Sequence, residues 1–198
     1  MLKLGGSLMD VARRLLISLK DMTTDGYSFL VIPGGGPMAN LVRKLFEKYN
    51  ISQEIAHWMA ILSMEQYGYF LTDKTGVESI KTIERIEGIR ILLPYQALIE
   101  NDLGLEHNWD YTSDSVAAWI SAILDANFIK ITDVDGVIID GKVVKEVHAG
   151  DLIGIPTCID QGALHLLKGR TCWILNGSHP EEFIASLKTG VGGTVIKG

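Results

Sequence analysis

Two glycine-rich segments lie near the start of the chain, GGS at 5–7 and GGG at 34–36, and each follows an apolar run. Glycine lets backbone N–H groups approach an anion closely, and a helix after such a turn presents its positive dipole end. Either segment alone could be a tight turn, but two of them favour a site for two phosphates or for one transferring phosphoryl group. The predicted phosphate-binding residues are Gly5, Gly6, Ser7, Gly34, Gly35 and Gly36.

Lys3 stands inside the first apolar run, between Leu2 and Leu4. A lysine in a buried strand is unfavourable unless it is paired or functional. Because side chains alternate along a strand, Lys3 should point away from its two leucine neighbours, near the glycine segments. A positive charge there would stabilise charge on a transferring phosphoryl group. A frayed lysine at an edge strand is the alternative interpretation.

Two acidic segments are further candidates. Asp114 lies at the predicted start of a helix, where it could cap the helix or orient a catalytic lysine. TDVDGV at 132–137 follows the apolar run FIKIT, and acidic residues at a strand end could bind a ribose or Mg²⁺. A simple turn explains this segment about as well. The nucleotide-binding candidates are Thr132, Asp133, Asp135, Gly136 and Val137.

Helical and strand patterns alternate along the chain. Strands are predicted at 1–4, 27–32, 89–93, 128–132, 171–175 and 193–196, with a hairpin from 137–140 and 142–147. Helices are predicted at 9–21, from Pro37, and at 52–71, 113–125, 160–168 and 180–187. Such alternation predicts an α/β fold with a mostly parallel sheet, in which ligands bind beyond the carboxyl ends of the strands. The apolar helix at 52–71 indicates core or a homo-oligomer interface.

Composition limits the class of protein. The 198 residues suit one domain, and 47% hydrophobic residues with 21% charged residues disfavour disorder. A net charge of -6 disfavours nucleic acid as a partner. Cys158 and Cys172 lack the spacing of a zinc site, and no apolar run approaches the ~20 residues of a membrane span. We expect a cytoplasmic protein without a membrane partner.

The ordered set of motifs resembles the amino acid kinase family. Its elements here are Lys3 with GGS, GGG at 34–36, Ser113–Asp114 with two alanines, TDVDGV, and a final Gly193–Thr194. The resemblance spans essentially the whole chain. It implies a three-layer αβα sandwich with the carbamate kinase-like fold, and transfer of a phosphoryl group from ATP with Mg²⁺. It also implies one domain over 1–198, with acceptor bound by about 1–110 and nucleotide by about 111–198.

Within the family, KLGGSL, PGGGPMANLVR and AHWMAILSMEQYGYFL in so short a chain are similar to the small kinases of methanofuran biosynthesis. This resemblance implies a small phosphate monoester with an ammonium group as acceptor. Arg43, in the helix after GGG, could hold the acceptor phosphate or equally lie on a solvated helix face. Glu65, Trp109 and Tyr111 are candidates for contact with the acceptor's ammonium group. Uridylate and isopentenyl phosphate kinases are alternatives, as is a non-catalytic nucleotide- or anion-binding protein. The stretch TCIDQGALHLLKG lacks the second lysine of many members, for which Lys145 and Lys168 are possible substitutes.

Overall fold

A computed structural model describes residues 1–99 and 105–198. Its centre is an eight-stranded sheet in the order β3-β4-β2-β1-β5-β9-β10-β8, and a separate hairpin pairs β6 with β7. The strands are β1 (Leu2–Leu4), β2 (Phe29–Pro33), β3 (Glu78–Ile80), β4 (Ile89–Leu92), β5 (Phe128–Thr132), β6 (Ile138–Ile139), β7 (Lys142–Val143), β8 (Glu146–His148), β9 (Thr171–Asn176) and β10 (Thr194–Lys197).

All neighbouring strands of this sheet run parallel except β9 and β10. The helices are α1 (Met9–Met22), α2 (Gly36–Tyr49), α3 (Gln53–Thr72), α4 (Pro94–Ile99), α5 (Ser113–Ile123), α6 (Gln161–Leu166) and α7 (Pro180–Thr189). The predicted α/β fold with a mostly parallel sheet is thereby confirmed.

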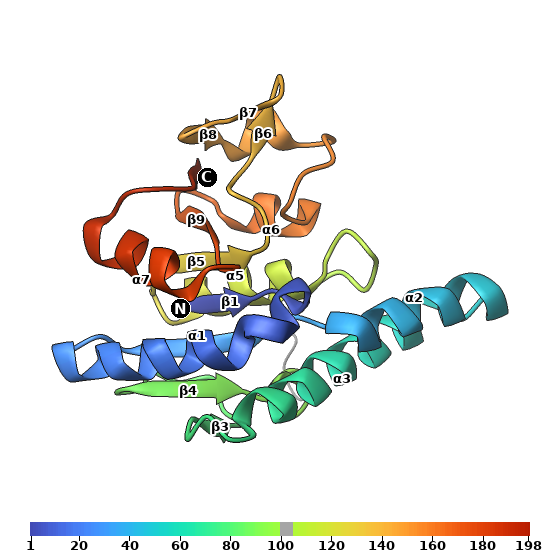
Figure 1. Cartoon of the computed structure of the whole chain (residues 1–198). Coiled ribbons are helices and arrows are strands. Elements are labelled where there is room, and N and C mark those ends of the chain that lie inside the picture. The colour runs from blue at the N-terminus through green and yellow to red at the C-terminus, as the bar shows by residue number, and fades with distance from the viewer. Residues whose placement is uncertain (100–104) are drawn as a thin grey trace.

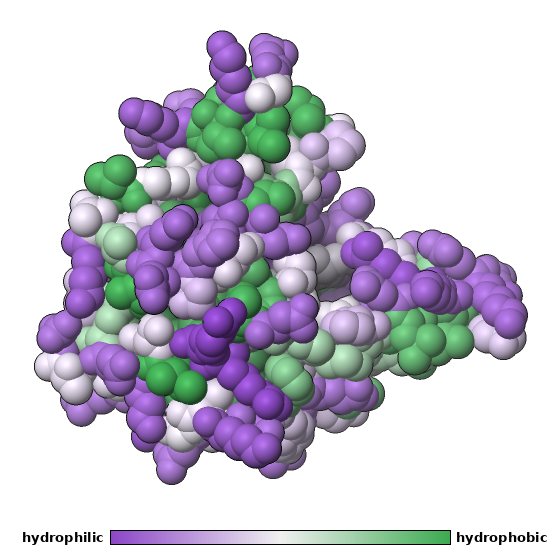
Figure 2. Space-filling model, in the orientation of Figure 1, coloured by the Kyte–Doolittle hydropathy of each residue, from purple (hydrophilic) through white to green (hydrophobic). Residues whose placement is uncertain are grey.

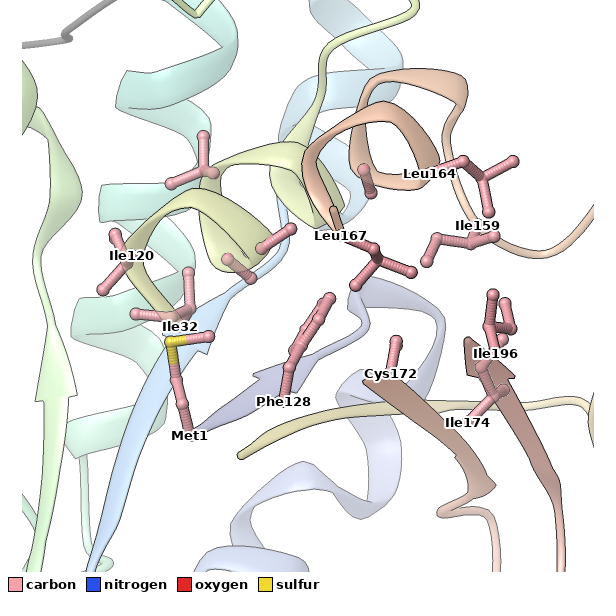
Figure 3. Packing of buried hydrophobic residues seen from close by; sticks show 14 of the residues in the cluster. Met1, Ile32, Ile120, Phe128, Ile159, Leu164, Leu167, Cys172, Ile174 and Ile196 are labelled. Carbon is pink, nitrogen blue, oxygen red and sulfur yellow. The ribbon is translucent and has the colours of Figure 1, made fainter. Parts of the chain in front are cut away.

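Helices cover both faces of the sheet. Leu2 and Leu4 of β1 pack with apolar residues of α1 and α7 on one face. The other face packs against α5 and α6, where Phe128, Cys172 and Ile174 of the strands meet Leu164 and neighbouring side chains (Figure 3). In Figure 1, α2 and α3 run side by side and project from the body. The αβα layering that the motifs imply is therefore present.

Local signals account for several helix boundaries. Ser52 accepts a hydrogen bond from the Ile55 N–H and caps α3, and Asp160 caps α6 through the Ala163 N–H. Pro37 and Pro180 occupy the first turns of α2 and α7, where a missing N–H is tolerated. Asn50 and Gly190 adopt left-handed conformations that end these two helices.

Three features depart from the predicted elements. Strand β3 and helix α4 occur in segments for which no element was predicted. The predicted second hairpin strand, 142–147, is divided: β7 stays in the hairpin, whereas β8 pairs in parallel with β10 at the sheet edge. The lysine-bearing strand β1 is flanked by β2 and β5, so the edge-strand interpretation of Lys3 was wrong.

Within the described residues, no helix is both long and apolar enough to cross a membrane.

Candidate active site

Two lysines lie side by side in the middle of the sheet. Lys3 of β1 is the register partner of Lys130 of β5. Because their leucine and isoleucine neighbours face α1, both lysines project from the opposite face, toward α5. Lys3 is 7% exposed and Lys130 is 4% exposed. Two buried ammonium groups on adjacent strands require compensation by a nearby acceptor.

Asp114 supplies that compensation from the first turn of α5. Its Oδ1 lies 2.7 Å from Lys3 Nζ, and its Oδ2 lies 2.5 Å from Lys130 Nζ. The carboxylate is 4% exposed, so all three groups are shielded from water. Lys130 also donates a hydrogen bond to the backbone carbonyl of Cys158. The Asp114 side chain thus bridges two lysines and does not cap its own helix.

The charges shift each other's protonation. Burial alone would raise the pKa of Asp114, but Lys130 and Lys3 outweigh it and hold this pKa well below the ordinary value. Burial acts to lower the pKa of Lys130, yet the Asp114 carboxylate outweighs burial and raises it. Burial lowers the pKa of Lys3 by more than Asp114 raises it. Lys3 is therefore the group of the three whose charge is most easily lost as pH rises.

Asp160 holds the segment that carries Asp114 in place. Its carboxylate accepts hydrogen bonds from Thr112, Ser115 and the Ala163 N–H, using both backbone and hydroxyl donors of Thr112 and Ser115. Its own N–H donates to Asp114 Oδ2 over 3.2 Å. This half-buried aspartate ties the start of α5 to the start of α6. Asp160 belongs to the stretch TCIDQGALHLLKG, where the sequence lacked a second lysine. That stretch thus holds the Lys3–Asp114–Lys130 group in place through Asp160.

The two glycine segments meet beside this charged group. A Cβ added to Gly6 would lie 2.2 Å from Gly36 Cα, so the two loops touch through their backbones. The N–H groups of Gly5 and Gly34 donate to Ile131 and Leu4 carbonyls and extend the sheet. Of the six predicted phosphate-binding residues, Gly5 and Gly34 therefore use their N–H groups in hydrogen bonds to neighbouring strands. The four that line the neighbouring pocket are Gly6, Ser7, Gly35 and Gly36.

A pocket of about 450 Å³ opens from these glycines, between α2, α3 and residues 108–113. Arg43 lines it and places its guanidinium 4.9 Å from the centre of the Trp109 ring, a cation–π contact. Among the residues that the structure describes, none of those lining the pocket is acidic, and the Arg43 guanidinium makes this part of the lining suited to an anion. In Figure 2 a recess separates the projecting α2–α3 arm from the body. Trp109 and Tyr111 line the pocket, whereas the Glu65 carboxylate accepts the Tyr95 N–H at α4.

The TDVDGV segment lies at the carboxyl end of β5. Asp133 accepts a hydrogen bond from the Ser7 hydroxyl over 2.9 Å and so joins this segment to the first glycine loop. This hydrogen bond lowers the pKa of Asp133. Asp135 accepts from Asn176 at the end of β9. Carboxylates from this segment therefore gather beyond the ends of β1, β5 and β9.

Gly136 and Val137 have a structural part in this segment. The buried Val137 N–H donates to Thr194 Oγ1, and Thr132 lies buried at the end of β5. Gly136 has φ +149, and a Cβ there would lie 2.3 Å from Thr194 Oγ1. Thr194, from the final motif of the sequence, thus holds this segment in place from β10.

Sequence reasoning missed Lys130 and Asp160. Lys145 and Lys168, the substitutes considered for a second lysine, are both exposed. Lys130 carried the same signal as Lys3, a lysine within an apolar strand, and the same argument would have selected it. Asp160 had a weaker signal, because an aspartate before a short helix most often serves as a cap.

Comparison with known proteins accords with this geometry. Residues 1–157 match the model of the amino acid kinase family. The chain is 36% identical to the (5-(aminomethyl)furan-3-yl)methyl phosphate kinase of Methanocaldococcus jannaschii, with 94% of this chain and 91% of that protein covered.

Two solved structures share the fold at low identity. Uridylate kinase from Archaeoglobus fulgidus has a TM-score of 0.74 at 19% identity, over 98% of this chain and 99% of that one. UMP kinase from Bacillus anthracis has a TM-score of 0.74 at 18% identity, over 99% and 94%.

Proposed function

Because the chain belongs to the amino acid kinase family and is an ATP-dependent phosphotransferase, we propose that its acceptor is (5-(aminomethyl)furan-3-yl)methyl phosphate. The product is the corresponding diphosphate, an intermediate of methanofuran biosynthesis. The 36% identical kinase named for this acceptor supports the choice. The observation that carries the proposal is the buried Lys3–Asp114–Lys130 group, set where two glycine loops meet an anion-suited pocket.

The reaction is a direct displacement at phosphorus. An oxygen of the acceptor phosphate forms a bond to the γ-phosphorus of ATP, while the bond from that phosphorus to the β–γ bridging oxygen breaks and ADP leaves. A phosphate monoester is already ionised at neutral pH, so no general base has to remove a proton. The main barrier is repulsion between two polyanions, which positive charge and N–H dipoles lower.

Lys3 and Asp114 are the catalytic residues of this proposal. The Lys3 ammonium stabilises negative charge on the transferring phosphoryl group, and Asp114 keeps it charged and oriented. The contact of 2.7 Å between them supports these roles, as do their burial and the position of Lys3 on the strand that leads into the first glycine loop. In such a shielded site a single charge has a larger effect than in water.

The acceptor occupies the pocket between α2 and α3. Arg43 holds its phosphate, which a planar guanidinium can contact with two parallel hydrogen bonds. Its ammonium group lies against the aromatic faces of Trp109 and Tyr111, which line the same pocket. The N-terminal part, about 1–110, thus supplies most of the acceptor site.

ATP occupies the other side, beyond β5 and β9, in the part from about 111 to 198. Thr132, Asp133, Asp135, Gly136 and Val137 form that wall, with Gly136 and Val137 acting through its shape. Asp133 is exposed and offers hard oxygen ligands, which fits Mg²⁺, an ion held in kinases mainly by phosphates and one or two carboxylates. When bound, Mg²⁺ would neutralise charge on the phosphates. No group of three or more His, Cys, Asp or Glu suited to a metal occurs among the described residues.

The test is ADP release from MgATP with three acceptors in parallel: the aminomethylfuran methyl phosphate, uridylate and isopentenyl phosphate. We expect fast turnover with the furan phosphate alone, and mass spectrometry should show its diphosphate. Preferential turnover of uridylate or isopentenyl phosphate would replace the proposed acceptor. Failure of all three, with nucleotide still bound, would favour a binding protein.

A further inference from the structure

We propose that Lys130 is a positioning residue for phosphoryl transfer, which holds the Asp114 carboxylate on Lys3 and adds positive charge behind it. This inference rests on the proposed function of the same site. Lys130 lies 2.5 Å from Asp114 Oδ2, and its second contact is the Cys158 carbonyl. It is 4% exposed, so it acts through Asp114 and Lys3.

The two lysines divide one carboxylate between them. Each oxygen of Asp114 faces one ammonium group, which fixes the rotation of the carboxylate about its own bond. The Cys158 carbonyl fixes Lys130 in turn, from the segment that precedes α6. Without Lys130, Asp114 Oδ2 would keep only the longer hydrogen bond of 3.2 Å from the Asp160 N–H, and Oδ1 would be held less firmly toward Lys3. The contacts from Cys158 to Lys130, from Lys130 to Asp114 and from Asp114 to Lys3 therefore fix the position of the Lys3 ammonium group.

The charge balance points to function. One lysine is enough to neutralise one buried carboxylate. A second buried ammonium group lowers the stability of the fold unless another interaction compensates for its desolvation. Asp160 is another carboxylate close by, and it is half-buried, but its carboxylate accepts hydrogen bonds from Thr112, Ser115 and Ala163. The excess positive charge beside Gly6 is what a site for two phosphorylated ligands requires.

The groups facing Lys130 set the sign of its effect. They are Asp114 of α5, Lys3 of β1, Asp133 at the end of β5, the Cys158 thiol before α6 and the buried Cys172 thiol of β9. Burial raises the pKa of both thiols, so these stay neutral near pH 7. Removing Lys130 removes a repulsion from Lys3, and Lys3 should then keep its proton to higher pH.

The test uses Lys130→Met, which keeps length but removes the charge, and Lys130→Arg, which keeps the charge. Lys188→Met, which removes an exposed lysine on α7, is the matched control. We expect Lys130→Met to lower kcat about 100-fold, with little change in either KM. In the pH profile of kcat for Lys130→Met, the loss of activity on the alkaline side should move to higher pH. Lys130→Arg should recover roughly tenfold of the lost kcat and return the alkaline side of the profile toward its original place.

A second readout does not depend on the acceptor. The protonation of Lys3 is followed by the ¹³Cε chemical shift of labelled lysine, with Lys3→Met to assign the signal. We expect its midpoint to rise in Lys130→Met. If the furan phosphate is not the acceptor, this shift still appears, and kcat is measured with the acceptor that turns over. An unchanged kcat per folded molecule, or an unmoved Lys3 midpoint, would overturn the role. Should Lys130→Met not fold, Lys130→Gln is measured in the same way.

Discussion

Lys3 and Lys130 are register partners on neighbouring parallel strands, and their ammonium groups contact opposite oxygens of one buried carboxylate. They are 127 positions apart in sequence, and only the adjacency of β1 and β5 brings them together. This pairing makes the middle of the sheet, where β1 leads into the first glycine loop, a preorganised positive site. The predictions below test what that site does.

Replacing Lys3 by methionine should abolish most of the turnover. The variant keeps the side-chain length but removes the charge nearest the glycine loops, so we expect kcat to fall by about 10²–10³-fold. Steady-state kinetics with saturating MgATP measure this loss. Circular dichroism is the control for an intact fold, and near-normal turnover would exclude Lys3 as a catalytic residue.

Replacing Asp114 by asparagine should damage both stability and turnover. The change leaves two buried ammonium groups without a countercharge, which we expect to cost roughly 3–5 kcal/mol in the free energy of unfolding. Lys3 then loses its proton more readily, and because the protonated form is active, the alkaline limb of kcat should move to lower pH. Activity per folded molecule and the pH profile measure this. A loss of thermal stability with unchanged kcat would assign Asp114 to helix structure alone.

Replacing Arg43 by methionine should weaken binding of the acceptor. Arg43 is the guanidinium that lines the pocket, so we expect the acceptor KM to rise about 10–100-fold, the equivalent of one charge-assisted contact. The KM for ATP should stay the same. Arg14→Met, on the exposed face of α1, is the control. An equal rise in both KM values would place Arg43 outside the acceptor site.

Replacing Gly6 by alanine should separate the two glycine loops. The added Cβ would lie 2.2 Å from Gly36 Cα, and both partners are backbone, so the loops must move. We expect a loss of about 1–3 kcal/mol in stability and a strong loss of kcat. Gly150→Ala is the matched control, because a Cβ there meets nothing within 4 Å. Equal behaviour of the two variants in melting and kinetics would refute the close-contact argument.

The helix α3 should form a homodimer interface. Ile55, Leu62 and Tyr69 are exposed at intervals of seven residues, which places them on one face of the helix. Burial of such an apolar stripe favours association. Light scattering should give the mass of a dimer or a higher oligomer, and Leu62→Glu should reduce it. Ile17→Glu, at another exposed apolar position, is the control, and a monomeric mass for the unmodified protein would contradict the prediction.

The sequence by itself determined most of the local structure. The alternation of short apolar runs with helical patterns predicted the parallel sheet, and FIKIT at 128–132 matches β5 residue for residue. Strand β3, with no buried residue, and the short helix α4 carry too little hydrophobic pattern to be predicted. Lys3 was found because a lysine is unusual in a buried strand, and the glycine loops because two of them follow predicted strands. Asp114 was found from its place at a predicted helix start.

Only the tertiary structure decided which of these residues share a site. Hydrophobic periodicity identifies strands but does not order them, so the place of β1 between β2 and β5 had to come from the fold. That order pairs Lys3 with Lys130 and brings Asp114 onto both. It also assigns the N–H groups of Gly5 and Gly34 to the sheet and leaves Gly6 and Gly36 at the pocket. Charge pairing and hydrogen-bond partners are properties of neighbours in space, and a single sequence records only neighbours along the chain.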